Sequence, residues 1–106
     1  MPDDNGAGPY RLSQFEPHVG SVFTALNVDQ EGGHAVTLVE ATAAESRPDV
    51  PRQDPFTLVF VGEVDAHLPQ ATYVLRHDAM GEVTIFLVPI GPEPDSGRMR
   101  YEAVFN

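Results

Sequence analysis

Two segments of the chain are hydrophobic at almost every position. They are residues 56–61 and residues 83–88. Successive side chains of a β-strand point to opposite faces of a sheet, so strands of this composition are apolar on both faces. Such strands need cover on both sides, either from a second layer of the same domain or from another chain.

A β-hairpin followed by one more strand is predicted near the C-terminus. Residues 71–77 and 82–90 are rich in β-branched and aromatic side chains, which suit a pleated surface. Between them lie Asp78, whose side chain we expect to stabilise the turn, and Gly81, which can adopt the positive φ of a hairpin loop. The last strand, residues 99–105, alternates apolar with more polar positions.

Three earlier segments also have strand character, namely residues 21–28, 34–43 and 55–61. In the second of them, strict alternation places Glu40 on the same side as Val36 and Leu38. Six strands with short turns and one longer loop predict an all-β fold, an antiparallel six-stranded small barrel or sandwich. A chain of 106 residues fits a single β domain at 11–106, preceded by a flexible N-terminal arm at 1–10.

One short helical turn is predicted within residues 12–20. Ser13 and Glu16 have the spacing of a capping box, in which each side chain accepts a hydrogen bond from the other residue's backbone. We expect the apolar side chains of this turn to face inward and plug one end of the sheet; they are Leu12, Phe15 and Val19.

The charge balance limits the partners that the chain can bind. Its net charge is −10, and all six basic residues are arginine. Nucleic acids and anionic membranes are bound by basic surfaces, so we expect neither as a partner. The chain has no cysteine, which excludes disulfide and thiolate chemistry. Its first residues lack the basic start and apolar core of a signal peptide, so we expect a cytoplasmic protein or part of an exported particle.

The residues that could carry chemistry do not form a recognisable motif. The four histidines are far apart in the sequence. Together with the acidic residues Asp65 or Asp78 they could bind a metal, but no pair has the close spacing of a zinc-binding motif. His77 and Asp78 are adjacent, and adjacent strand residues point to opposite faces, which argues against an acid–base pair. We expect His77 to pack or hydrogen-bond at the end of its strand. The sequence therefore predicts no catalytic residue, no metal ligand, no cofactor and no enzymatic activity.

Contacts with a partner protein are predicted from the Leu68-Pro69-Gln70 loop and from the strands that are apolar on both faces. For Gln70 we favour a second interpretation, in which its side chain bonds buried backbone groups. The predicted contact residues are Phe56, Leu68, Pro69, Gln70 and Phe86. They indicate a non-catalytic interaction or assembly module with a protein partner or a homo-oligomer. The alternative is a small-ligand-binding β-barrel lined by Phe60, Tyr73, Phe86 and Tyr101, and an enzyme is the weakest hypothesis.

Several stretches together resemble a known family. They are Phe15-x-x-His18-Val19-Gly20-Ser21-x-Phe23-Thr24, Phe56–Phe60, Leu68–Tyr73 and the C-terminal Tyr101-Glu102-Ala103-Val104-Phe105-Asn106. The chain resembles a small uncharacterised bacterial domain-of-unknown-function family whose members have about this length and end in a similar strand. The genes of that family resemble neighbours of phage-tail-collar-like protein genes. The resemblance implies an assembly role in a phage-tail-like particle and supplies no catalytic residues.

Overall fold

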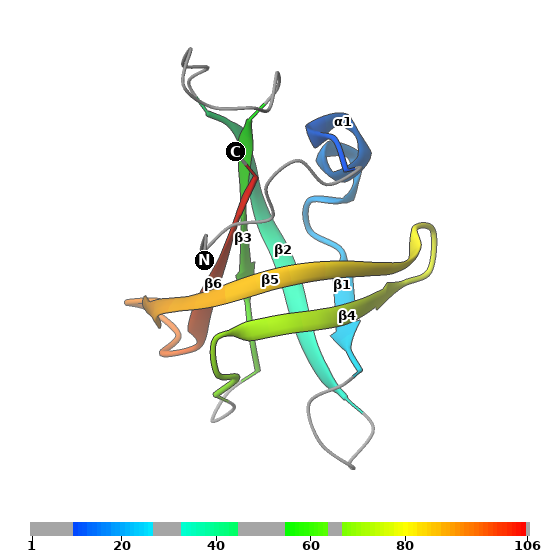
Figure 1. Cartoon of the computed structure of the whole chain (residues 1–106). Helices are drawn as coiled ribbons and strands as arrows, with labels where there is room; N and C mark the ends of the chain where they lie inside the picture. Colours follow the sequence, from blue (N-terminus) through cyan, green and yellow to red (C-terminus); the bar gives the residue numbers. More distant parts are fainter. Residues whose placement is uncertain (1–9, 27–32, 45–54, 64–66, 106) are drawn as a thin grey trace.

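The computed structural model describes residues 10–26, 33–44, 55–63 and 67–105, and its six strands form a closed antiparallel barrel. The strands are β1 (Val22–Ala25), β2 (His34–Ala43), β3 (Phe56–Val61), β4 (Ala71–His77), β5 (Gly81–Pro92) and β6 (Met99–Phe105). Their order is β1-β2-β3-β6-β5-β4, and β4 closes the barrel on β1 (Figure 1). The predicted all-β fold is thereby confirmed as a barrel. The predicted arm, except for Tyr10, and the long loop at 45–54 lie outside the described residues.

Most strand pairs of the barrel join neighbours in the sequence, and only two pairs are non-local. The β4–β5 hairpin pairs Tyr73 with Ile85, and its turn ends at Gly81, which has the expected positive φ of 74°. The two non-local pairs are β3 with β6 and β1 with β4. These two pairs join the meander β1-β2-β3 to the meander β4-β5-β6 and so close the barrel. They also pair backbone edges that an open sheet would leave unpaired.

The interior of the barrel is filled by side chains, as expected for so few strands. Each strand directs alternate residues inward, and these residues form one hydrophobic core. Its large side chains with no exposed surface are Phe15, Phe23, Leu38, Phe56, Leu58, Phe60, Leu75, Ile85, Leu87, Tyr101 and Phe105. The aromatic residues predicted on strands therefore supply much of the core, and the inner faces of β3 and β5 are fully covered.

One end of the barrel is covered by a short helical segment, α1 (Leu12–Phe15) followed by the 3-10 turn η1 (Glu16–His18). Phe15 is buried, with ring centroids 6.0 Å from Phe56 and 6.1 Å from Phe105, and those two rings stack on each other at 4.3 Å. Aromatic contacts at these distances add to the free energy gained from burial alone. The predicted plug is thus present at the end where β3 begins and β6 ends.

Two details predicted for this helical segment are wrong. The Gln14 side chain, rather than Glu16, accepts a hydrogen bond at the helix start, from the Arg11 backbone N–H at 2.6 Å. The helix begins two residues earlier than the predicted cap at Ser13 requires, which changes the pair of residues that can cap it. Val19 was expected to face inward, but it follows η1 and is 46% exposed.

The opposite end of the barrel is closed by the loop before β4. The Leu68 side chain is buried in the core, and its backbone N–H donates to the Tyr101 hydroxyl at 2.9 Å. The Tyr73 hydroxyl donates to the carbonyl oxygen of Pro69. Two tyrosines of the core therefore hold this loop in place with their polar ends, which is how a buried tyrosine usually satisfies its hydroxyl.

A β-bulge in β2 overturns the alternation predicted for that strand. Leu38 pairs with Phe60, but Glu40 rather than Val39 pairs with Val59, so the register shifts between Leu38 and Glu40. The extra residue reverses which side chains point inward. Glu40 is therefore exposed instead of lying on the side of Leu38, and the following Ala41 packs against the core.

Candidate functional site

Two of the predicted partner contacts lie inside the barrel. Phe56 has no exposed surface and Leu68 is 4% exposed, so neither can meet another protein while the domain is folded. Phe56 was chosen because β3 is apolar on both faces, yet it occupies the inner face. Leu68 was chosen because its loop is unusual, and that loop closes the barrel from within.

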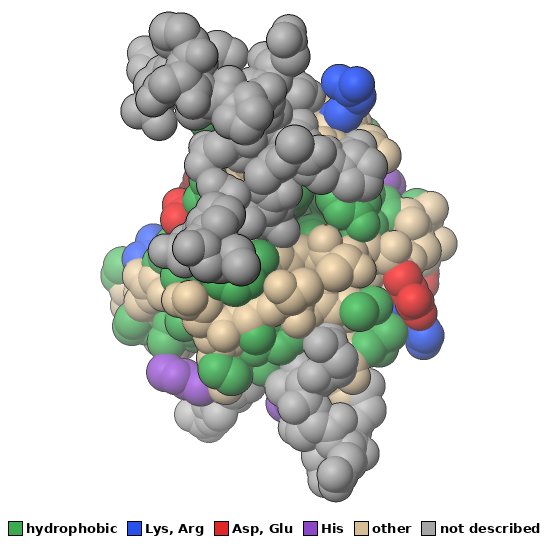
Figure 2. All heavy atoms as spheres, in the orientation of Figure 1, with side chains coloured by type: hydrophobic (Ala, Val, Ile, Leu, Met, Phe, Trp, Pro, Cys, Tyr) green, Lys and Arg blue, Asp and Glu red, His purple; other side chains and the backbone are tan. Residues whose placement is uncertain are grey.

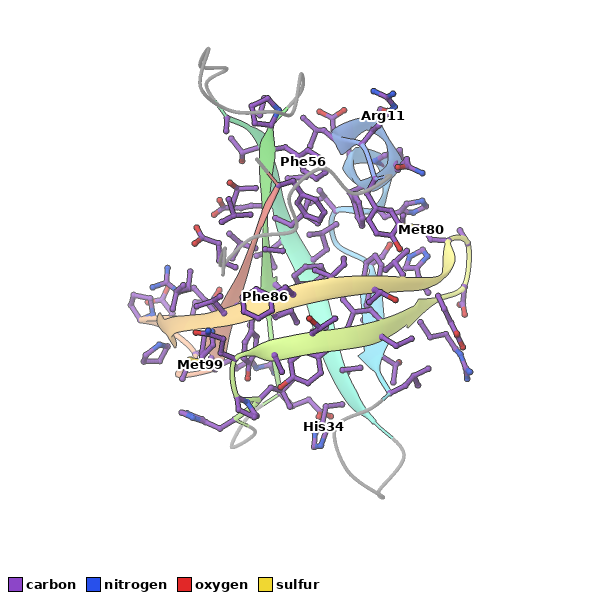
Figure 3. The ribbon with its side chains drawn as sticks, viewed as in Figure 1. Arg11, His34, Phe56, Met80, Phe86 and Met99 are labelled. Atoms are coloured by element: carbon purple, nitrogen blue, oxygen red, sulfur yellow. The ribbon has the colours of Figure 1, made fainter. Side chains whose placement is uncertain are left out.

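The other predicted contacts reach the surface. Pro69 and Gln70 are exposed, and Phe86 is half-buried on the outer face of β5 (Figure 3). The interpretation in which the exposed Gln70 side chain bonds buried backbone groups stays a prediction. Figure 2 shows the face that carries β4 and β5, where hydrophobic side chains alternate with polar side chains and backbone.

His77 and its neighbours form the most unusual polar cluster of the described core. His77 is 8% exposed, and its ring lies 4.4 Å from the ring of Phe23 and 4.5 Å from that of His18. The backbone N–H groups of Ala79 and Met80 both donate to His77 Nδ1, at 3.0 and 3.2 Å. The predicted role of His77 at its strand end is confirmed. Two backbone N–H groups of the turn are thus held by His77, and Asp78, which was expected to stabilise the turn, is exposed.

The ionisable side chains of the described ranges do not converge on a metal site. His34 Nδ1 lies 3.3 Å from Glu63 Oε1 at the other end of the barrel, and Glu63 is exposed. Within residues 10–26, 33–44, 55–63 and 67–105, no group of three or more His, Cys, Asp or Glu could hold a metal ion. Such a group is the usual minimum for a protein metal centre.

Burial raises the pKa of both core tyrosines. The pKa of Tyr101 is raised by burial, and the hydrogen bond from the Leu68 N–H lowers it by less. The pKa of Tyr73 is raised by burial and, in addition, by the neighbouring Tyr101. Both hydroxyls are therefore neutral near neutral pH and act as structural hydrogen-bonding groups rather than as acids or bases.

Exposed hydrophobic side chains gather around β1 and β2. Val19, Val22 and Val39 are 46%, 55% and 37% exposed, and they lie on neighbouring segments: Val22 pairs with Thr37, and the Gly20 N–H donates to the Leu38 carbonyl oxygen. We call these three valines the β1–β2 patch. Only one other large hydrophobic side chain of the described residues, Ile90, is as exposed. A cluster of this kind on a folded domain is a candidate contact surface.

A shallow hollow of about 250 Å³ adjoins the β1–β2 patch on the outer surface of the barrel. Its lining residues are Thr37, Val39, Val61, Glu93, Ser96 and Arg98. Strands β2 and β3 supply the apolar part, and the turn between β5 and β6 supplies the polar part. That turn is held by a hydrogen bond of 2.6 Å from Ser96 Oγ to Glu93 Oε1 and one of 3.2 Å from the Arg98 N–H to Ser96 Oγ.

The sequence alone did not indicate this surface. Val39 was taken as one more position of a regular strand, on the face opposite Leu38, and that side chain is 37% exposed. Val19 was assigned to the inner side of a helix. The apolar–acidic pair Val39-Glu40, which breaks the alternation of β2, was the one available signal of a bulge.

Comparison with known protein families identifies the domain. A family model described as a domain of unknown function, DUF6916, matches residues 10–105. The chain belongs to the DUF6916 family. The DUF6916 match begins at Tyr10, whose ring packs edge-on against Phe15 and Phe105, and it spans all six strands of the barrel. This confirms the resemblance as far as membership of a domain-of-unknown-function family is concerned.

No curated protein and no solved structure matches this DUF6916 chain. In the part of the chain that is described, no helix has the length and apolar character needed to cross a membrane.

Proposed function

We propose that this DUF6916 domain is a non-catalytic interaction or assembly module that docks onto a partner protein. The observation that supports the proposal most directly is the β1–β2 patch, where Val19, Val22 and Val39 are exposed beside a hollow. The barrel interior holds the aliphatic side chains of the inward-facing positions, among them Leu38, Leu58 and Ile85. Valines left outside on neighbouring segments cost solubility, which a bound partner would offset.

The filled interior favours this function over a ligand-binding barrel. The aromatic residues expected to line such a cavity include Phe60 and Tyr101, and both are fully buried among other core side chains. The Phe23 and Phe60 rings, for example, pack edge-to-face at 5.6 Å across the interior. Core side chains already fill the interior of the barrel, and a ligand would have to displace them.

The charge of the chain defines the kind of surface that it would meet. With 16 acidic residues against six arginines, the domain attracts cationic surfaces and repels anionic ones. We expect the partner to present basic side chains around an apolar centre, since charge mainly directs association while apolar burial stabilises the complex. We propose that the domain and its partner belong to a phage-tail-like or other multi-protein particle.

The test is co-purification of the native domain with its partner, compared with a variant of the β1–β2 patch. We expect Val22→Glu/Val39→Glu to lose a partner that the unaltered domain retains in stoichiometric amount. Thr84→Glu is the control, because Thr84 is exposed on β5, which passes on the other side of the barrel (Figure 1). A domain that light scattering shows to be strictly monomeric and that retains no partner would contradict the proposal.

A further inference from the structure

The strand β2 is longer than the strand that flanks it on one side. β2 spans His34–Ala43, whereas β1 pairs only with His34 to Thr37. Backbone hydrogen bonds from Gly20 and to Ser21 extend this contact to Leu38. Beyond Leu38, among the described residues, β2 has a strand partner only on its other side, where β3 pairs with it as far as Ala43.

The register of β2 on β3 shows which backbone groups point to the unpaired edge. The Ala44 N–H donates to the Pro55 carbonyl oxygen at 2.9 Å, and Thr42 pairs with Thr57 in the same ladder. In an antiparallel ladder, alternate residues direct both backbone groups to the same neighbour. The N–H and C=O groups of Ala41 and Ala43 therefore point away from β3, toward the side where β1 has ended.

This edge is accessible and carries little protection. Thr42, Ala43 and Ala44 are exposed, and Ala41 is half-buried. The helix α1 lies beside β2, and its Phe15 points inward at the end of the barrel, where it packs on Phe56 and Phe105 (Figure 1). Proteins commonly protect such edges with lysine, proline or a bulge. Here the bulge at Val39 and the single charge of Glu40 precede the open segment, whose own residues are small and uncharged.

We propose that the edge of β2 at residues 41–43 accepts an extended, basic segment of a partner protein by β-strand addition. This inference rests on the proposed function and specifies how the partner binds. Main-chain hydrogen bonds to Ala41 and Ala43 supply the affinity, as in other complexes of this kind. The adjoining Val39 gives the added strand an apolar side chain to cover.

Charge favours a basic segment over a second copy of this chain. Two copies, each with a net charge of −10, would repel each other on approach. Glu40 stands exposed at the start of the open segment, where a lysine or arginine of the added strand can meet it. Opposite charges on adjacent strands stabilise a sheet, and like charges destabilise it.

The experiment measures binding of an acetylated peptide of alternating valine and lysine to the full chain, beside a peptide of alternating valine and glutamate. We expect the basic peptide to bind and the acidic one not to bind. Ala43→Pro should weaken binding of the basic peptide by about tenfold or more, because proline removes the edge N–H while all hydrogen bonds to β3 remain. Glu40→Gln should weaken it by a smaller factor, with Glu82→Gln on β5 as the matched control.

A measurement on the unaltered chain covers the case in which Ala43→Pro does not fold. The basic peptide should slow amide hydrogen exchange at Ala41 and Ala43, whose N–H groups would become hydrogen-bonded. Unchanged exchange there, or equal binding of both peptides, overturns the inference. So does a dimer in analytical ultracentrifugation that Ala43→Pro converts to a monomer, because the occupant is then a second copy. Loss of a native partner through Val22→Glu/Val39→Glu but not through a folded Ala43→Pro keeps the proposed function and removes this inference.

Discussion

Replacing Tyr101 with phenylalanine tests how the loop before β4 closes its end of the barrel. The Tyr101 hydroxyl accepts the Leu68 N–H at 2.9 Å, and both residues belong to the core. Phenylalanine keeps the ring packing but leaves a buried N–H without an acceptor, which costs about 1–3 kcal/mol. For a domain of this size, each kcal/mol lowers the melting temperature by about 4–8 °C. We therefore expect a clear loss of stability from the removal of one oxygen atom.

The same hydroxyls predict how stability depends on alkaline pH. Burial raises the pKa of Tyr101 and of Tyr73 above the ordinary tyrosine value of 10.0. A group whose pKa is raised on folding stabilises the protein fully below its unfolded pKa and loses that contribution as pH rises through the folded pKa. The chain has no lysine and no cysteine, so tyrosines dominate its titration in this range. We expect stability to fall from about pH 10 upward.

Urea unfolding of the unaltered chain, Tyr101→Phe, Tyr73→Phe and the double variant measures both effects. Tyr73→Phe is the matched control, since its acceptor belongs to the exposed Pro69, where water can replace the lost donor. We expect its cost to be smaller, and the double variant to show a flatter profile above pH 10. A loss below about 0.5 kcal/mol for Tyr101→Phe, or equal pH profiles for the unaltered and double-variant chains, would refute the reasoning.

Three further predictions concern the core and the turns. Phe56→Ala should lower the free energy of unfolding by about 3–5 kcal/mol, because Phe56 is fully buried; a smaller loss in denaturant unfolding would mean that the barrel end repacks. Gly33→Ala should cost more than Gly81→Ala, since a Cβ at Gly33 would lie 2.7 Å from a backbone oxygen while one at Gly81 meets nothing; calorimetry giving equal costs would contradict this. His77→Phe should cost about 1–3 kcal/mol because two turn N–H groups lose their acceptor, whereas Asp78→Ala should change stability by less than about 0.5 kcal/mol; thermal melts showing the reverse order would mean that Asp78 holds the turn.

The strands could be predicted because they depend on local composition. The bounds of β4 and β6 agree with the prediction, and β5 is longer than predicted, since it extends to Pro92 beyond a second register shift. β-branched and aromatic residues mark a strand wherever it packs, so no knowledge of the partner strand is needed. The role of His77 was also local, because its ring bonds the backbone two and three residues ahead.

The candidate site could not be predicted in the same way. Phe56 and Phe86 belong to strands that are apolar on both faces, and composition does not indicate which face turns inward. The structure places Phe56 in the core and leaves Phe86 half outside. The bulge at Val39 depends on how β2 meets β3, and residues 44–55 separate these two strands in the sequence.

By itself, the sequence determined that this chain is a small acidic β domain with enough aromatic and aliphatic side chains for one core. The tertiary structure decided that the sheet closes, because closure depends on the non-local pairs β3–β6 and β1–β4. It also decided which valines remain on the outer surface of the barrel and how far β2 extends beyond the end of its pairing with β1. Those outcomes depend on register and strand length across the barrel, and each strand adopts them only when its neighbours are in place.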